Sequence, residues 1–277
     1  MINTVNIKQQ QLQNTYFTTG SGEKVVLIIG SCRVCPIVNY FIEYNEANGD
    51  KFTIHTLDPF NLNWNEKDDR VDYTEALLKV EKDERLLSML KTVDVFIHEH
   101  YQNAEMFNCN KSAPKNLYQF GLQPMIDICL PNFNNLFILV GDIVSNDVEI
   151  RKKAIEDYNV VGKLTEQTER DIKNISNRNI QKFYDVCNKS DIPEMAYYFL
   201  WHYTKERLFW TSNHVSKNFT LAILDFMNKK YLHLDLSNLN REHEDMFANN
   251  FTSLTEYDFK ISGIEWNEEI KPLKDKL

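Results

Sequence analysis

A group of small, reactive and charged residues directly follows an apolar run near the start of the chain: Gly30, Ser31, Cys32, Arg33 and Cys35. The run itself, residues 25–29, has the length and β-branched content of a buried strand, and the apolar residues after Pro36 recur at helical spacing. The first N–H groups of a helix and its dipole favour an anion or a thiolate. The sequence therefore predicts a reactive or anion-binding turn between a strand and a helix.

Cys32 is the candidate nucleophile of this turn. A cysteine nucleophile needs a group that accepts its proton, and the candidates are His98, His100 and His214. Arg33 is unusual in the first turn of a helix, where the dipole disfavours a cation. It points either to a bound phosphate or carboxylate or to an ordinary ion pair with a nearby acid.

Two histidines, His98 and His100, alternate along another predicted strand and therefore face the same side. A His-x-His pair can chelate zinc, but no third ligand lies at a recognisable spacing. The pattern favours histidines in a hydrogen-bonded site, and we predict no metal.

The elements around these residues alternate between strands and helices. We expect strands at residues 25–29, 52–57, 93–97 and 136–140, and helices at 73–90 and 117–129. This order predicts an α/β fold with a mainly parallel sheet. Three strands run into polar segments: Ser31-Cys32-Arg33, His98-Glu99-His100 and Gly141-Asp142. Because ligands bind beyond the carboxyl ends of parallel strands, we expect these segments along one edge of the sheet.

The second half of the chain is helical and charged. Residues 164–187 form the longest predicted helix, and residues 215–230 form another. We expect a polar N-terminal arm over 1–22, a single α/β domain over 23–237 with a helical insertion at about 145–203, and a C-terminal wrapping tail over 238–277.

The composition limits the classes of partner. The chain of 277 residues is 43% hydrophobic and carries a formal charge of −9, which argues against nucleic acid or an anionic membrane as partner. No run approaches the roughly 20 apolar residues of a membrane span, and residues 1–13 lack the apolar core of a signal peptide. Five irregularly spaced cysteines do not form a recognisable disulfide framework. We therefore expect a reduced, cytoplasmic protein, and the sequence leaves its oligomeric state open.

Two segments resemble elements of the WcbI-type polysaccharide biosynthesis proteins. Gly30-Ser31-Cys32-Arg33 is similar to that family's Gly-Asn-Cys-Gln element, and residues 207–216 resemble its Asn-His-Pro-Ser block, which precedes a helix. Residues 171–191 also resemble the charged helical region between the two. The resemblance covers about residues 24–230. This chain departs from the pattern at Ser31, at Arg33 and at Val215, which stands where Pro is usual.

The resemblance implies a variant of the SGNH hydrolase fold, a three-layer α/β/α sandwich. It places Cys32 at the nucleophile position and His214 at that of the base. The Asp expected three residues before the base is Thr211 here, so a Cys–His dyad is implied rather than a triad. The family is implicated in glycan biosynthesis as an acetyltransferase, which implies coenzyme A or acetyl-coenzyme A as ligand and a sugar or glycan as acceptor.

The residues suggest the same acyl-transfer chemistry. Backbone N–H groups near Cys32 would stabilise an oxyanion, and Arg33 with Gly30 would hold the acyl carrier. The candidate supporting side chains are Ser31, Gln102, Asn213, His98 and His100.

Three alternatives stay open at the level of sequence. An SGNH-like esterase or deacetylase would use the same residues with water as acceptor. Cys32 and Cys35 form a Cys-x-x-Cys at a helix start, as in thioredoxin-like redox proteins. A non-catalytic glycan- or nucleotide-binding module would keep the fold without the chemistry.

Overall fold

The structure is a computed structural model that describes residues 16–30, 32–57, 64–65, 70–71, 84–100, 115–239, 245–249 and 251–277. Ser31, Gln102 and the side chain of Cys32 lie outside this part, as does most of the predicted helix at 73–90. The chain divides into two compact units: unit 1 is Met1–Asn132 with Met227–His243, and unit 2 is Phe133–Phe226 with Glu244–Leu277.

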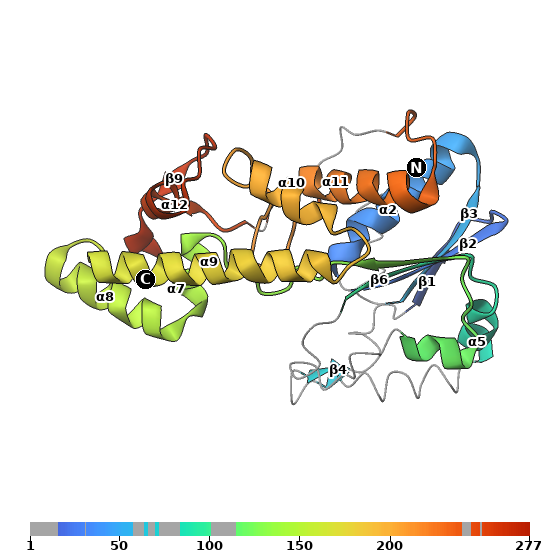
Figure 1. Ribbon diagram of the computed structural model, residues 1–277, viewed down its shortest axis with the longest axis horizontal. Coiled ribbons are helices and arrows are strands. Elements are labelled where there is room, and N and C mark those ends of the chain that lie inside the picture. The colour runs from blue at the N-terminus through green and yellow to red at the C-terminus, as the bar shows by residue number, and fades with distance from the viewer. Residues whose placement is uncertain are drawn as a thin grey trace. The chain divides into compact units, whose positions relative to one another are not determined.

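A five-stranded sheet forms the centre of unit 1 (Figure 1). Its strands lie in the order β1 (Tyr16–Thr19), β3 (Phe52–Leu57), β2 (Lys24–Ile29), β6 (Val95–Glu99) and β7 (Ile126–Leu130). β1 runs antiparallel to β3, and the other neighbours are parallel. The predicted α/β class with a mainly parallel sheet is confirmed. A separate two-stranded sheet joins β4 (Trp64–Asn65) and β5 (Arg70–Val71).

The strand order reverses direction between β2 and β6. From β2 the chain goes to β3 on one side, and it later adds β6 and then β7 on the other. In open parallel sheets, the carboxyl ends of the two strands at such a switch point flank the crevice that binds ligands. Gly30 follows β2 and Glu99 ends β6, so the turn predicted to be reactive lies at this switch point.

Helices pack on both faces of the sheet. The helix α2 (Cys35–Asn48) contacts β3, where the rings of Phe41 and Phe52 meet edge to face with centroids 5.4 Å apart. On the other face, Leu27 and Phe96 pack with α5 (Glu84–Leu90) and the 3-10 helix η2 (Lys115–Phe120). The three-layer sandwich implied by the resemblance stays a prediction for the chain as a whole.

Unit 2 is mainly helical. Its helices are α7 (Val140–Asn146), α8 (Val148–Val161), α9 (Glu166–Asn188), α10 (Glu194–His202), most of α11 (Lys217–Met227) and α12 (Glu256–Ser262). Two short strands, β8 (Leu254–Thr255) and β9 (Ile270–Lys271), and a 3-10 helix, η4 (Leu273–Lys276), complete it. The expected long helix at 164–187 is α9. The expected helix at 215–230 is α11, continued by a π-helical turn at Asn228–Leu232.

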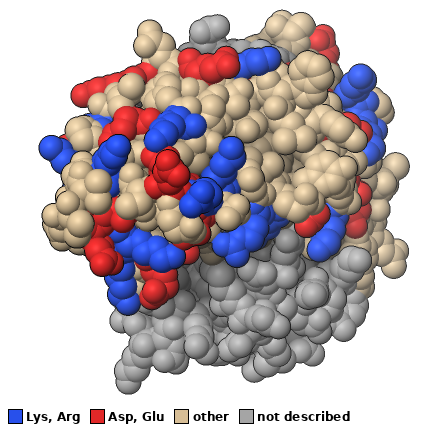
Figure 2. Space-filling model, turned by 60° about the vertical axis from the view of Figure 1, so that its left-hand side comes forward, with Lys and Arg blue, Asp and Glu red and all other residues tan. Residues whose placement is uncertain are grey.

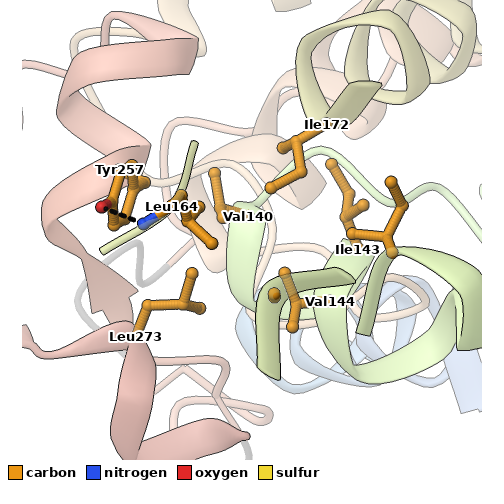
Figure 3. Close-up of a cluster of buried hydrophobic side chains, with 9 residues drawn as sticks. Val140, Ile143, Val144, Leu164, Ile172, Tyr257 and Leu273 are labelled. Atoms are coloured by element: carbon orange, nitrogen blue, oxygen red, sulfur yellow. Dashed lines mark hydrogen bonds between the residues drawn. The ribbon is translucent and has the colours of Figure 1, made fainter. Parts of the chain in front are cut away.

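The core of unit 2 joins helices to the C-terminal segment (Figure 3). Val140 and Val144 of α7, Ile172 of α9, and Leu273 meet in one cluster of buried side chains. Tyr257 of α12 packs there too, and its hydroxyl accepts a hydrogen bond from the backbone N–H of Leu164 at 3.1 Å. The segment over 238–277, predicted to be a wrapping tail, therefore contributes residues to a hydrophobic core.

Two expectations about elements are wrong, and one segment holds an element that was not predicted. The predicted helix at 117–129 is the 3-10 helix η2 followed by strand β7. The predicted strand at 136–140 is an irregular segment that leads into α7. The N-terminal arm includes strand β1, which pairs with β3 over its full length.

Charged side chains of both signs are mixed on the face drawn in Figure 2. Exposed ion pairs of unit 2 include Lys153 with Asp171 at 2.9 Å and Lys260 with Glu169. No helix among the described residues is both long and apolar enough to cross a membrane.

Candidate functional site

The turn after β2 consists of a short 3-10 helix, η1 (Cys32–Val34), that runs directly into α2. Pro36 lies in the first turn of α2, where its fixed φ suits a helix start. The first turns of η1 and α2 contain no acidic residue. Val34, at the N-cap, has no polar side-chain atom with which to cap the N–H groups of the first turn. Cys32 thus begins a helical segment whose positive end faces the switch point.

Arg33 forms a buried, bidentate ion pair with Glu99. Its Nε donates to Oε1 at 2.7 Å and its Nη2 donates to Oε2 at 3.1 Å. The two side chains are only 8% and 3% exposed. The pair connects the turn after β2 to the end of β6. Of the two interpretations of Arg33, the structure shows the ion pair with an acid of the protein, and binding of a ligand anion stays a prediction. Glu99 was not singled out from the sequence, although it lies between the two candidate histidines.

Gly30 allows the close approach of these segments. A Cβ at this position would lie 2.5 Å from Cγ1 of Val34 and 3.2 Å from Oε2 of Glu99. A side chain at residue 30 would therefore displace both η1 and the carboxylate that holds Arg33.

His98 lies on the opposite face of β6 from Glu99, because successive residues of a strand alternate. It is buried, its ring stacks on Phe96, and its Nε2 lies 3.1 Å from Oδ1 of Asp127. Tyr118 donates its hydroxyl to the other oxygen of Asp127, and burial, together with Asp127, raises the pKa of that hydroxyl. His98 is therefore part of a Tyr–Asp–His chain on the face that carries η2.

His100 is half-buried and directly follows β6. Its backbone N–H donates to the carbonyl of Leu130 at 2.7 Å, which extends the ladder between β6 and β7. The supporting roles predicted for His98 and His100 stay predictions.

The second candidate segment, in unit 2, forms a closed loop between Phe209 and Val215, which pair as an antiparallel bridge. The N–H of Trp210 donates to the carbonyl of His214 at 2.8 Å across the loop. Ser216 follows, and its hydroxyl accepts from the N–H of Phe219 at the start of α11. The expected arrangement of this block ahead of a helix is therefore present.

His214 is held on two sides. Its ring stacks on Phe247 with centroids 4.4 Å apart and planes 18° from parallel. Its Nδ1 lies 3.2 Å from Oγ1 of Thr211. The candidate base His214 is thus contacted at Nδ1 by Thr211. From the sequence, Thr211 is notable only because it stands where the resemblance predicts an Asp.

Asn213 is oriented by the loop beside it. Its Oδ1 accepts a hydrogen bond from the backbone N–H of Asn135 at 2.8 Å. Because Oδ1 must be the acceptor there, the Nδ2 amide is the end that can donate to a ligand. Its predicted supporting role fits this orientation and stays a prediction.

A buried arginine supports the same loop. The guanidinium of Arg207 donates to both oxygens of Glu268 and to the carbonyl of Thr252. It also lies 4.9 Å from the ring centroid of Trp210 and 5.0 Å from that of Trp266. No local pattern indicates this role, because Thr252 and Glu268 are far from Arg207 along the chain.

Gly141 and Asp142 do not follow a strand, contrary to expectation: both lie inside α7, in unit 2. Asp142 is buried and accepts a hydrogen bond from the hydroxyl of Thr252 at 2.6 Å. Burial raises the pKa of its carboxyl to about 6, although Thr252 and the nearby Lys276 act in the opposite direction. Asp142 therefore belongs to the interior of unit 2.

The structure thus brings together Gly30, Arg33 and Glu99 in unit 1, and Thr211, Asn213 and His214 in unit 2. Cys32 and His214 belong to different units, and their pairing stays a prediction. Within the described residues, no group of three or more His, Cys, Asp or Glu side chains is placed to hold a metal ion. Cys35 and Cys187 are buried, and burial raises the pKa of the Cys187 thiol.

Comparisons with known proteins agree with the expected resemblance at the level of fold. No family model matches the sequence, and no curated protein matches it. Among solved structures, the chain is similar to WcbI, described as a novel polysaccharide biosynthesis enzyme, in its native form without a disulfide bond between coenzyme A and a cysteine of that protein. The TM-score is 0.52, the sequence identity is 13%, and the match covers 88% of this chain and 82% of WcbI.

The fold of this chain is therefore similar to that of WcbI. At 13% identity the likeness concerns the backbone alone, so the relation to SGNH hydrolases and the roles of individual residues stay predictions.

Proposed function

We propose that the protein is an acyltransferase of polysaccharide biosynthesis that moves an acyl group, acetyl in the simplest case, from a coenzyme A thioester to a sugar or glycan. Cys32 is the proposed nucleophile and His214 the proposed base. The observation that carries the proposal is the place of Cys32, which begins η1 at the switch point of the sheet, directly ahead of α2. The similarity to WcbI, whose description names coenzyme A, supports this class of substrate.

The proposed reaction has two steps. The Cys32 thiolate attacks the thioester carbonyl, the bond to the coenzyme A sulfur breaks, and the departing thiolate takes a proton from solvent. A hydroxyl or amine of the acceptor then attacks the acyl-cysteine, its proton passes to His214, and the Cys32 thiolate is restored. Backbone N–H groups of η1 and the Nδ2 amide of Asn213 are the proposed donors to the oxyanion.

The turn after β2 fits an anionic acyl carrier in part. The absence of acidic residues from the first turns of η1 and α2 suits a phosphate. The space beside Gly30 is taken up by Val34 and the carboxylate of Glu99, so its predicted role in holding the carrier stays a prediction. Arg33 would add charge-assisted hydrogen bonds, but Glu99 already accepts from two of its nitrogens. We therefore expect Arg33 to contribute less to affinity than an unpaired guanidinium would.

The first test is acylation of the full chain by acetyl-coenzyme A without an acceptor, followed by intact mass and peptide mapping. We expect one acetyl group on Cys32. Cys32→Ser should abolish the adduct at this position, whereas Cys35→Ser, the matched control in the same segment, should keep it. His214→Ala should slow transfer to a sugar acceptor by roughly 10²–10⁴-fold.

Calorimetric titration with coenzyme A separates binding from chemistry. Binding without an adduct would overturn the catalytic claim and favour a binding module. Loss of activity in Cys35→Ser as well as in Cys32→Ser would favour thiol redox chemistry, because acyl transfer needs only one of the two thiols. Release of free acetate without transfer to any acceptor would favour the esterase.

A further inference from the structure

The hydroxyl of Thr211 has three polar neighbours. Its Oγ1 accepts hydrogen bonds from the backbone N–H groups of Asn213 and His214, each at 3.2 Å. The third neighbour is Nδ1 of the His214 ring, also at 3.2 Å. The two backbone contacts fix the direction of the bond to the ring, because a backbone N–H can only donate.

A threonine hydroxyl has two lone pairs and one proton. The two backbone N–H groups occupy the lone pairs, so the proton is what remains for Nδ1. A nitrogen that accepts a hydrogen bond carries no proton, and a neutral imidazole then carries its proton on the other nitrogen. We infer that Thr211 is a positioning residue that holds neutral His214 as the tautomer with its proton on Nε2.

The loop keeps this arrangement in place. Stacking on Phe247 fixes the plane of the His214 ring. The bridge between Phe209 and Val215 and the hydrogen bond from Trp210 N–H to the His214 carbonyl close the loop on itself. A half-turn of the ring in this plane would put Cδ2 in the place of Nδ1 and would lose the contact with Thr211.

A carboxylate at residue 211 would have the opposite effect. An ionised Asp only accepts hydrogen bonds, so it would place a proton on Nδ1 and leave Nε2 as the basic nitrogen. It would also stabilise the imidazolium, whereas the hydroxyl of Thr211 donates to Nδ1 and thereby favours the neutral ring.

This inference deepens the proposed function and depends on it only for its catalytic consequence. In this tautomer, Nε2 of His214 carries the ring proton. To accept a proton from the acyl acceptor, His214 must first shift its own proton to Nδ1, and the Thr211 hydroxyl must turn away. The ionisation of Cys32 then depends on the field of the helix start rather than on a preformed thiolate–imidazolium pair.

The test is two-bond ¹H–¹⁵N NMR of the full chain labelled at histidine. The chain has seven histidines, and the signals of His214 are assigned by their loss in His214→Gln. We expect a protonated Nε2 and an unprotonated Nδ1 in the wild type and in Thr211→Ser, which keeps the hydroxyl. Thr211→Asp, which keeps the acceptor for both backbone N–H groups, should reverse the two nitrogens and raise the His214 pKa by about 1–3 units.

A wild-type spectrum with the proton on Nδ1 would overturn the inference, as would a Thr211→Asp spectrum identical to that of the wild type. The spectrum needs no substrate. If the expected tautomers are found but acetyl-coenzyme A acylates no residue, the proposed function fails and the inference stands. If both hold, the acidic limb of kcat/KM should move to higher pH in Thr211→Asp and stay in place in Thr211→Ser.

Discussion

At the scale of single residues, the buried ion pair between Arg33 and Glu99 holds the turn after β2 to the end of β6. Its geometry is bidentate and both side chains are excluded from water. Two buried charges are costly to desolvate, so such a pair adds little stability compared with apolar residues of the same shape. Breaking it from one side is expensive, because the remaining charge stays buried.

Glu99→Ala should therefore lower the free energy of unfolding by about 3–5 kcal/mol, whereas the double change Arg33→Met with Glu99→Leu should restore most of the loss. Urea denaturation of the variants measures both. Lys153→Ala removes an exposed ion pair and should change the free energy of unfolding by about 0–1 kcal/mol. A Glu99→Ala variant as stable as Lys153→Ala would contradict the structure at this turn.

Gly30→Ala tests the close approach of the same segments. The added Cβ would meet Val34 at 2.5 Å, so we expect a loss of about 1–3 kcal/mol in the free energy of unfolding. Val34→Ala removes the obstructing methyl groups, and in that background the cost of Gly30→Ala should shrink. Additive effects of the two changes would show that the Cβ meets no obstacle there.

At the scale of elements, the C-terminal segment is part of the core of unit 2. Leu273 is fully buried against residues of α7 and α9. Asp258 of α12 accepts hydrogen bonds from the N–H of Val140 and from Thr255, which joins the starts of α7 and α12. The segment from Leu254 to Leu273 therefore contributes to the stability of the helices that precede it.

Leu273→Ala should lower the free energy of unfolding by about 2–5 kcal/mol, the cost of a cavity at a fully buried leucine. Leu200 on α10, which is 43% exposed, is the matched control, and Leu200→Ala should cost much less. Equal effects of the two substitutions, measured by thermal and urea denaturation, would mean that the C-terminal segment only wraps the surface.

The sequence predicted those elements whose pattern is local. Residues 52–57 alternate and form β3 with the expected bounds, and the apolar run after Lys24 forms β2. The turn at Gly30 and Cys32, the loop around His214 and the helix after it were also found in this way. Each depends on neighbours within a few positions along the chain.

The errors arose where distant contacts decide the conformation. The apolar run at 136–140 has the composition of a strand, but Leu136 donates its N–H to the carbonyl of Ser212 and Val140 donates to Asp258. The predicted helix at 117–129 extends over residues that form β7, because β6 provides a parallel partner for them. Glu99 and Arg207 were missed for the same reason, since their partners lie 66 and 61 positions away along the chain.

At the scale of the whole molecule, the chain is acidic, with a formal charge of −9. Burial raises the pKa of some of its carboxyl groups. The pKa of Asp142 is about 6 and that of Glu43 about 7, in each case chiefly through desolvation. A carboxyl group with a higher pKa in the folded state than in the unfolded state binds its proton more tightly when folded. Stability therefore falls as the pH rises from the unfolded pKa towards and past the folded one.

Asp142→Asn should remove its part of this dependence. For a shift from 3.8 to about 6, the wild type loses about 3 kcal/mol of unfolding free energy in total, of which roughly 1–2 kcal/mol is lost between about pH 5 and about pH 8, and the variant keeps this free energy. Melting temperatures of both proteins at about pH 5 and about pH 8 measure the difference. We expect the melting temperature of the variant to rise relative to that of the wild type at the higher pH. The stability of the variant should still fall somewhat with pH, because Glu43 is unchanged. An equal difference in melting temperature between the two proteins at both pH values would contradict the raised pKa of Asp142.

The division of the chain into units has a consequence for its synthesis. Neither unit is one continuous segment, because unit 1 includes Met227–His243 and unit 2 includes Glu244–Leu277. A ribosome that has made residues 1–226 has completed neither of them. The hydrophobic cluster of unit 2 still lacks Tyr257 and Leu273 at that stage, so its apolar helix faces stay uncovered in the nascent chain. We therefore expect unit 2 to complete its core only after Leu273 has been synthesised, and a chaperone that binds exposed apolar helices would meet it before then.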